Sequence, residues 1–168
     1  MLNSVGLQNG GVDKLINYEL PNLVTKDTRI IANIAGSTIE ECAELAEKLN
    51  GTAVDMIELN ISCPNVKQGG AAFGTDCNVA GAVTKAVKDV TEKPLMVKLS
   101  PNVTSIVDIA KSVEANGADA VSLINTLLGM RIDIKTRRPI LKNNVGGLSG
   151  PAVFPVAVRM VWQGANAV

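Results

Sequence analysis

A cysteine and two asparagines stand together where a predicted buried strand ends. The segment "ELNISCPN" spans residues 58–65 and places Asn60, Cys63 and Asn65 after an apolar run, with a proline in the loop. A thiol in such a loop can act as a base or nucleophile, or it can be a small buried side chain. The sequence contains no histidine, so activation of the thiol by histidine, as in cysteine hydrolases, is excluded.

Lys98 is the second candidate for chemistry. It lies inside "PLMVKLSP", residues 94–101, where the neighbouring side chains should be buried. An isolated ammonium is costly to bury, so Lys98 needs a partner or an anionic ligand. It could form a Schiff base with a carbonyl substrate, or place positive charge beside a cofactor that becomes anionic. The alternative is an ion pair in the interior of the fold.

Five asparagines fall at predicted loops or strand ends. A carboxamide presents two N–H donors and a carbonyl acceptor, which suits a planar heterocycle that carries both amide N–H and carbonyl groups. Any single asparagine could instead stabilise a turn. The five are Asn3, Asn33, Asn60, Asn65 and Asn125.

Two glycine-rich segments follow these candidates. Residues 66–76, "VKQGGAAFGTD", could form a lid that excludes water from a bound substrate, or a plain connection. Residues 143–152, "NNVGGLSGPA", could offer backbone N–H groups to a phosphate or a flavin ring edge. Since glycines are common in loops, neither segment is specific on its own.

Short apolar strands alternate with amphipathic helices from residue 29 onward. Ser37 and Glu40 have the spacing of a capping box at the start of the first helix. Residues 1–7 could be the tail of a further strand, and residues 127–150 are expected to be irregular. The predicted strands cover 29–36, 53–62, 94–100 and 119–127, and the predicted helices cover 37–51, 78–91, 105–117 and 151–163.

Apolar strands separated by helices predict an α/β fold with a parallel sheet, either doubly wound or a (β/α)8 TIM barrel. Polar residues end four successive strands, which favours the barrel, because its active site is built from the carboxyl ends of all strands. A barrel needs about 250 residues, so the 168 present predict an incomplete central portion of one. The polar residues are Asn33, Asn60 with Cys63, Lys98, and Asn125 with Thr126.

Composition narrows the possible partners. The 16 basic residues balance the 16 acidic ones, so no global field points to nucleic acid or a membrane surface. Three cysteines without metal-binding spacing, and no histidine, argue against a disulfide scaffold and a zinc site. No apolar run approaches the roughly 20 residues of a membrane span. We therefore expect a cytoplasmic protein in which Cys42 is a core residue, with Cys77 undecided.

The combined motifs resemble the dihydroorotate dehydrogenase family, in particular the catalytic subunits of its NAD-linked class. The resemblance covers essentially the whole chain. It implies a (β/α)8 barrel with one FMN per chain that oxidises dihydroorotate to orotate in de novo pyrimidine (UMP) biosynthesis. The motifs are "NSVGLQN", "IIANIAG", "ELNISCPN" with "GGAAFGTD", "VKLSPNV", "SLINTLLGMRIDIKTRRP" and "GGLSGPA".

The same resemblance implies a role for each matching residue. Cys63 matches the catalytic base, and no metal ligand is implied. Residues expected to contact substrate are Asn3, Ser4, Val5, Gly6, Leu7, Asn60, Asn125 and Thr126. Residues expected to contact FMN are Asn33, Asn60, Lys98, Ile124 and Gly150.

The resemblance also implies partner proteins, and it implies that the chain covers only part of the family's barrel domain. Electrons would pass to NAD through an iron–sulfur flavoprotein subunit carrying FAD and a 2Fe–2S cluster, with a homodimer of catalytic chains inside a heterotetramer. Neither nucleic acid nor a membrane is expected. Family members are longer, so residues 1–168 are expected to be a partial FMN-binding barrel domain. Two alternatives stay open: a Schiff-base lyase on a similar barrel that uses Lys98, and a non-catalytic truncated remnant.

Overall fold

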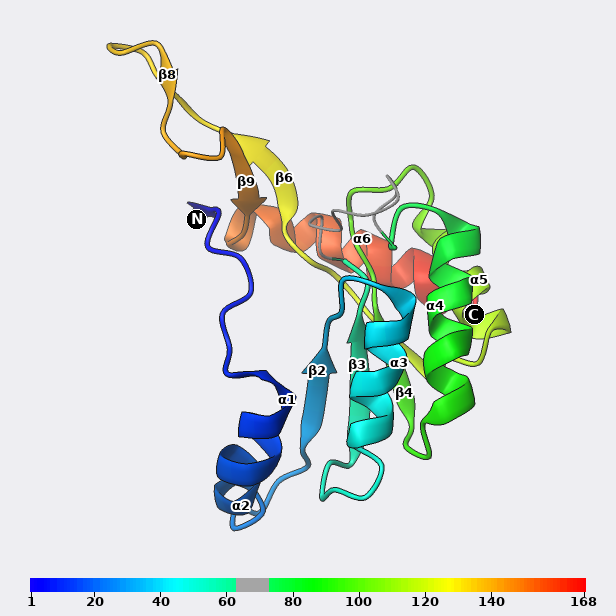
Figure 1. The fold of residues 1–168 in the computed structure, drawn as a ribbon. Helices are drawn as coiled ribbons and strands as arrows, with labels where there is room; N and C mark the ends of the chain where they lie inside the picture. Colours follow the sequence, from blue (N-terminus) through cyan, green and yellow to red (C-terminus); the bar gives the residue numbers. More distant parts are fainter. Residues whose placement is uncertain (63–72) are drawn as a thin grey trace.

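A four-stranded parallel sheet forms the centre of the molecule. The computed structural model describes residues 1–62 and 73–168, so Cys63, Asn65 and most of the predicted lid lie outside the described residues. The strands are β2 (Ile31–Ile34), β3 (Met56–Asn60), β4 (Leu95–Lys98) and β5 (Ala120–Ser122). They lie side by side in sequence order, all parallel (Figure 1). The predicted α/β class with a parallel sheet is therefore confirmed.

Three helices connect these strands and lie together on one face of the sheet (Figure 1). They are α3 (Ile39–Lys48), α4 (Cys77–Val90) and α5 (Ile106–Ala115). Each begins after a side-chain cap, which satisfies backbone N–H groups that the first helical turn leaves free. The caps are Thr38, Asp76 and Ser105.

The capping box predicted at Ser37 and Glu40 is wrong by one residue. Thr38 Oγ1 accepts from the Glu41 backbone N–H at 3.1 Å, and the Glu41 carboxylate accepts from the Ser37 backbone N–H at 2.6 Å. Ser37 and Thr38 are adjacent in the sequence, as are Glu40 and Glu41, so the capping-box spacing fits both the 37/40 pair and the 38/41 pair.

The two faces of the sheet have different chemistry. Alternate side chains such as Ile57, Leu59 and Val97 are buried beneath the helices, and they form the main core. The opposite face carries polar side chains, including Asn33 and Glu58, and we call it the open face. A doubly wound sheet would carry helices on both faces and reverse its strand order. Neither occurs among the described strands, although these four strands do not close a barrel.

Residues 127–148 form strands rather than the irregular segment predicted, and we call this region the β arm. Strands β6 (Leu127–Met130) and β9 (Val145–Leu148) pair antiparallel. Beyond them projects a hairpin of β7 (Ile132–Asp133) and β8 (Arg138–Pro139) (Figure 1). The alternation of apolar and polar residues in "GMRIDIK" is the signal that predicts such strands, but each is shorter than a typical strand of about five residues.

The predicted strand tail at the N-terminus exists but belongs to a different sheet. Strand β1 (Leu2–Asn3) pairs antiparallel with β9, so it extends the β arm and not the parallel sheet. Residues 11–23 then form an unpredicted helical segment, which divides into α1 (Gly11–Lys14), a π-helical turn (Leu15–Glu19) and α2 (Leu20–Leu23). Leu20 in this segment is buried in the core.

The last predicted helix is present from residue 151 onward. It starts as a 3₁₀ turn (Pro151–Val153) and continues as α6 (Phe154–Ala165), which packs against α5. Pro155 falls in the first turn of α6, where its missing N–H costs no helical hydrogen bond. Among the described residues, no helix is both long and apolar enough to cross a membrane.

Candidate functional site

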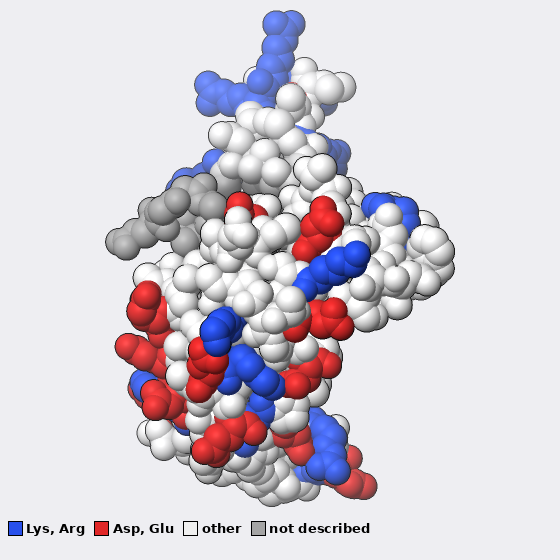
Figure 2. All heavy atoms as spheres, turned by 90° about the vertical axis from the view of Figure 1, so that its right-hand side faces the viewer, with Lys and Arg blue, Asp and Glu red and all other residues white. Residues whose placement is uncertain are grey.

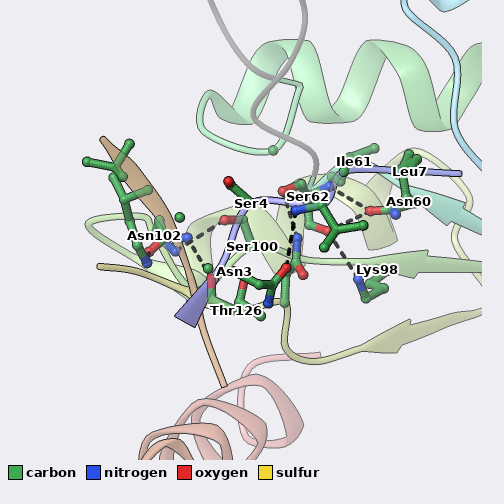
Figure 3. A pocket seen from close by; sticks show the side chains of 18 of the residues that line it. Asn3, Ser4, Leu7, Asn60, Ile61, Ser62, Lys98, Ser100, Asn102 and Thr126 are labelled. Carbon is green, nitrogen blue, oxygen red and sulfur yellow. Dashed lines mark hydrogen bonds between the residues drawn. The ribbon is translucent and has the colours of Figure 1, made fainter. Parts of the chain in front are cut away.

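A cavity of about 660 Å³ lies where the carboxyl ends of the parallel strands meet β1 and the β arm (Figure 3). Its size is within the range of about 300–1,000 Å³ that is typical of small-molecule sites. Four stretches from distant parts of the chain line it, together with Gly74 and Thr75. The first two are residues 3–7 and residues 60–62. The third contributes Lys98, Ser100 and Asn102, and the fourth contributes Asn125, Thr126, Leu128, Asn143, Val145, Gly146 and Gly147.

All eight residues predicted to bind substrate line this one cavity. They are Asn3, Ser4, Val5, Gly6, Leu7, Asn60, Asn125 and Thr126, and Lys98 lies there with them. The remaining predicted flavin ligands lie outside its lining. Asn33 is on the open face of β2, Ile124 packs against the core, and Gly150 precedes the 3₁₀ turn. Cys63 lies outside the described residues, directly after the cavity residue Ser62.

Ser62 connects the predicted site residues and was missed in the sequence. Its hydroxyl donates to Asn60 Oδ1 at 2.5 Å and accepts from Lys98 Nζ at 3.3 Å, and its carbonyl accepts from Asn125 Nδ2 at 3.1 Å (Figure 3). Only 5% of Ser62 is exposed, so these bonds form in a water-poor environment. Because Asn60 Oδ1 accepts from Ser62, a ligand bound by Asn60 would accept from its NH₂ group, for which no hydrogen bond is found among the described residues.

Lys98 supplies the only charge among the described lining residues. The interior ion pair considered as its alternative role is not found in the part of the chain that the structure describes: Lys98 has no carboxylate within salt-bridge distance there, and its ammonium contacts the neutral hydroxyl of Ser62. A half-buried ammonium with no described carboxylate in salt-bridge contact favours an anionic ligand.

Asn102 is a second residue that sequence reasoning missed. Its Nδ2 donates to the Thr126 carbonyl at 3.0 Å, and its Oδ1 accepts from the Leu128 backbone N–H at 2.9 Å. One carboxamide from the loop after β4 thereby fixes the chain as it enters the β arm. The spacing of Ser100 and Asn102 indicates a turn, and the Asn102 N–H does donate to Ser100 Oγ at 3.2 Å, but the long-range contacts depend on tertiary structure.

Two glycines let the β arm approach the other walls of the cavity. A Cβ atom at Gly146 would overlap the backbone carbonyl of Asn3, and one at Gly147 would overlap the Thr126 hydroxyl. Glycine is therefore required for close packing at this point. The described contacts of "NNVGGLSGPA" thus join segments of the chain, and its predicted phosphate-binding role stays a prediction.

The lining offers carboxamides, hydroxyls and one ammonium, and it contains no carboxylate among its described residues. This donor set suits a planar, negatively charged heterocycle. The described residues hold no group of three or more His, Cys, Asp or Glu side chains placed to bind a metal ion. The donors fit the edge of a pyrimidine or a flavin ring.

The two described cysteines lie outside this cavity. Cys42 is buried on α3, as predicted for a core residue, and burial raises the pKa of its thiol. Cys77 is half-buried at the start of α4, and its backbone carbonyl accepts from the Ser112 hydroxyl at 2.5 Å. Neither residue is part of the cavity lining.

Comparison with known proteins agrees with this geometry. The family profile described as "Dihydroorotate dehydrogenase" matches residues 1–168. A protein from Alkaliphilus metalliredigens named "Dihydroorotate dehydrogenase B (NAD(+)), catalytic subunit" is 62% identical over the whole chain, as is its namesake from Alkaliphilus oremlandii. The protein of the same name from Geobacillus sp. strain WCH70 is 57% identical.

The chain belongs to the dihydroorotate dehydrogenase family. The resemblance seen in the motifs is confirmed, including the similarity to NAD-linked catalytic subunits. The chain spans about half the length of these curated relatives, covering 56% of the Alkaliphilus proteins and 54% of the Geobacillus protein.

Proposed function

We propose that this chain is the pyrimidine-binding part of an FMN-dependent dihydroorotate dehydrogenase catalytic subunit, which oxidises dihydroorotate to orotate in de novo pyrimidine biosynthesis. The observation that carries the proposal is the convergence of Asn60, Lys98, Asn125 and Thr126 with the segment 3–7 on one cavity. The names of the relatives support the substrate.

A (β/α)8 barrel is part of the proposal. Sequential parallel strands with helices on one face support it, because this is the repeating arrangement of a barrel wall. A hydrogen bond from Ser122 to Glu58 supports it further. Strands lie about 4.8 Å apart, and this bond spans from β5 to β3 across β4, which a concave open face favours.

The reaction removes a proton from C5 and a hydride from C6 of dihydroorotate. We assign the proton to Cys63, whose thiolate would be the base. Ser62, the preceding residue in the sequence, is buried and lines the cavity. Bound FMN would supply the acceptor for the hydride.

The described side chains would bind and orient the ring. Ser62 occupies the carbonyl of Asn60, so the NH₂ group of Asn60 would donate to a ring carbonyl, and the Ser62 carbonyl anchors Asn125. Lys98 would stabilise negative charge on the reacting partners. The side chains fit the flavin as well, and Asn33, Asn60, Lys98, Ile124 and Gly150 are the residues that would hold it.

The partner subunit and the electron acceptor complete the proposal. The words "catalytic subunit" and "NAD(+)" in the names of the relatives support a second subunit and NAD as acceptor. We assign FAD and a 2Fe–2S cluster to that iron–sulfur flavoprotein subunit, and a homodimer of catalytic chains to the heterotetramer. A cytoplasmic location is proposed from the cysteine content of the sequence.

The absorption spectrum of the purified chain, recorded without oxygen before and after addition of dihydroorotate, tests this function. We expect a flavin band that bleaches on addition of substrate. Cys63→Ala should keep the band and slow the bleaching by about 10² to 10⁴-fold, the usual contribution of a positioned base. Cys77→Ala, which removes a thiol outside the cavity, is the matched control.

Three results would count against the proposal. A colourless chain would show that these residues do not hold FMN by themselves. Full-rate bleaching in Cys63→Ala would remove the cysteine from its role as base. Covalent trapping of a carbonyl substrate on Lys98 by borohydride would favour the Schiff-base lyase instead.

A further inference from the structure

Glu58 is the one carboxylate on the open face of the described parallel strands, and the proposed mechanism does not use it. It lies on β3, two residues before Asn60, so both side chains point to the same side of the sheet. Both of its oxygens accept hydrogen bonds. Oε2 accepts from the Asn33 NH₂ group on β2, and Oε1 accepts from the Ser122 hydroxyl on β5 at 2.6 Å.

These bonds determine which hydrogen-bonding group Asn33 and Ser122 can offer to other partners. An asparagine side chain can present either its NH₂ group or its carbonyl, and the carboxylate of Glu58 can pair only with the NH₂ group. Asn33 Oδ1 is therefore left as the acceptor directed to other partners. The Ser122 proton is likewise committed to Glu58, which leaves the hydroxyl oxygen to accept.

This arrangement adjoins the cavity. Strand register pairs Asn33 with Glu58 and Asn60 with Lys98, and it pairs Lys98 with Ser122. Asn60 and Lys98 line the cavity, so the bonds of Glu58 lie in the adjacent part of the same sheet face. Ser62 occupies the carbonyl of Asn60 and leaves its NH₂ group to donate, whereas Glu58 occupies the NH₂ group of Asn33 and leaves its carbonyl to accept.

We propose that Glu58 is a positioning residue of the site: its carboxylate holds the Asn33 carbonyl as an acceptor for the ring N–H of a bound planar heterocycle, and it holds Ser122 as a second acceptor on the same face of the sheet. The inference rests on the proposed function for the identity of that heterocycle, FMN. Glu58 itself contacts neither reactant. Its effect on binding is transmitted by the orientation of the Asn33 carboxamide.

Two variants separate orientation from charge. In Glu58→Gln, the head group has only one acceptor oxygen, so Asn33 and Ser122 cannot both keep their bonds. Ser122→Ala removes one hydrogen bond and keeps the carboxylate. Glu44→Gln, on the exposed side of α3, removes a carboxylate far from the open face and is the matched control.

Two readouts are made on the purified chain. The first is the ¹H–¹⁵N signal pair of the Asn33 side-chain NH₂ group, identified by its loss in Asn33→Asp. The second is FMN affinity from quenching of flavin fluorescence. We expect Glu58→Gln to move the Asn33 signals and weaken FMN binding about tenfold, the equivalent of one hydrogen bond to a charged group. Ser122→Ala should have a smaller effect, and Glu44→Gln none.

The outcomes separate this inference from the function on which it rests. Unchanged Asn33 signals in Glu58→Gln overturn the inference, and so does unchanged FMN affinity. If the parent chain does not bind FMN, the proposed function fails for this chain, and the Asn33 signals alone then decide: movement supports the positioning role and constancy overturns it. Circular dichroism of each variant distinguishes these results from unfolding.

Discussion

The parallel sheet and the β arm form opposite walls of one cavity, but they are built on different principles. The sheet buries one complete face beneath α3, α4 and α5, and residues such as Leu59 and Val97 are fully enclosed. The β arm has short strands, and many of its large apolar side chains are exposed, including Leu128 and Ile134. Asn60 and Lys98, which carry proposed roles in the site, come from the parallel sheet, the better-packed region.

Charge differs between the two regions as well. Over the helices that cover the sheet, acidic and basic side chains are mixed, whereas basic side chains gather at the end of the projecting hairpin (Figure 2). The hairpin carries Arg131, Lys135, Arg137 and Arg138, all exposed, with Asp133 as its acidic residue. The two regions also contribute differently to the cavity. The sheet side supplies hydrogen-bond donors such as Lys98, and the arm approaches closely through its backbone at Gly146 and Gly147.

The largest expected effect comes from opening the core of the sheet. Leu59→Ala removes a fully buried side chain and should lower the free energy of unfolding by about 2 to 5 kcal/mol, because it leaves a cavity. Leu128→Ala, at a position that is 62% exposed in the arm, should change it by less than about 0.5 kcal/mol. Urea denaturation measures both. Equal losses would show that the two regions are packed alike.

A smaller and more local effect is expected from Gly146→Ala. The added Cβ would overlap the Asn3 carbonyl, so β1 must shift, at a cost of about 1 to 3 kcal/mol. Amide hydrogen exchange should become faster at residues 2–3 and 145–148 while the parallel sheet keeps its protection. Gly51→Ala, where a Cβ meets open space, is the control. Unchanged exchange at these residues would contradict the close packing.

Ser62→Ala tests the link between Asn60, Lys98 and Asn125 on the sheet side. Loss of the buried hydroxyl should lower the free energy of unfolding by about 1 to 2 kcal/mol, since two side-chain hydrogen bonds disappear. The carbonyl bond from Asn125 stays, because it uses the backbone. The NMR signals of the Lys98 ammonium should move in this variant. Signals at unchanged positions would exclude Ser62 as its partner.

The smallest expected effect on stability concerns Asp119 beside the sheet and Asp133 in the arm, which should both respond to pH and should differ in their response to salt. Hydrogen bonding from the Lys88 ammonium, and then from the Leu95 N–H, lowers the pKa of Asp119 beside the sheet. In the arm, the backbone N–H groups of Lys135 and Thr136 lower the pKa of Asp133. Because both folded-state pKa values are depressed, each carboxylate stabilises the fold above the ordinary aspartate pKa of about 3.9 and loses that effect as the pH falls through its folded-state value.

The matching measurement uses Asp119→Asn and Asp133→Asn in thermal unfolding at neutral and at acidic pH. Each substitution should be destabilising at neutral pH and have little effect in acid. Raising the salt from about 0.1 M to about 1 M should reduce the loss in Asp119→Asn more, because only Asp119 pairs with a charged donor. Equal salt dependence would contradict this assignment.

The sequence predicted the parallel strands and their helices because each has a clear apolar period. The same approach failed in the β arm, where two-residue strands such as β7 are stabilised by pairing with residues distant in the chain. Among site residues, Asn60, Lys98 and Asn125 could be found because a polar side chain at a strand end is unusual. Ser62 and Asn102 could not, because their roles depend on hydrogen bonds to residues more than 20 positions away.

The central claim is that the sheet and the arm side of the cavity bind one pyrimidine together. Titration of the ¹⁵N-labelled chain with orotate tests it most directly. We expect signals of Asn60 and Asn125 to move together with those of residues 3–7, at the same orotate concentration. Movement confined to one of the two walls, or none in either, would contradict the account.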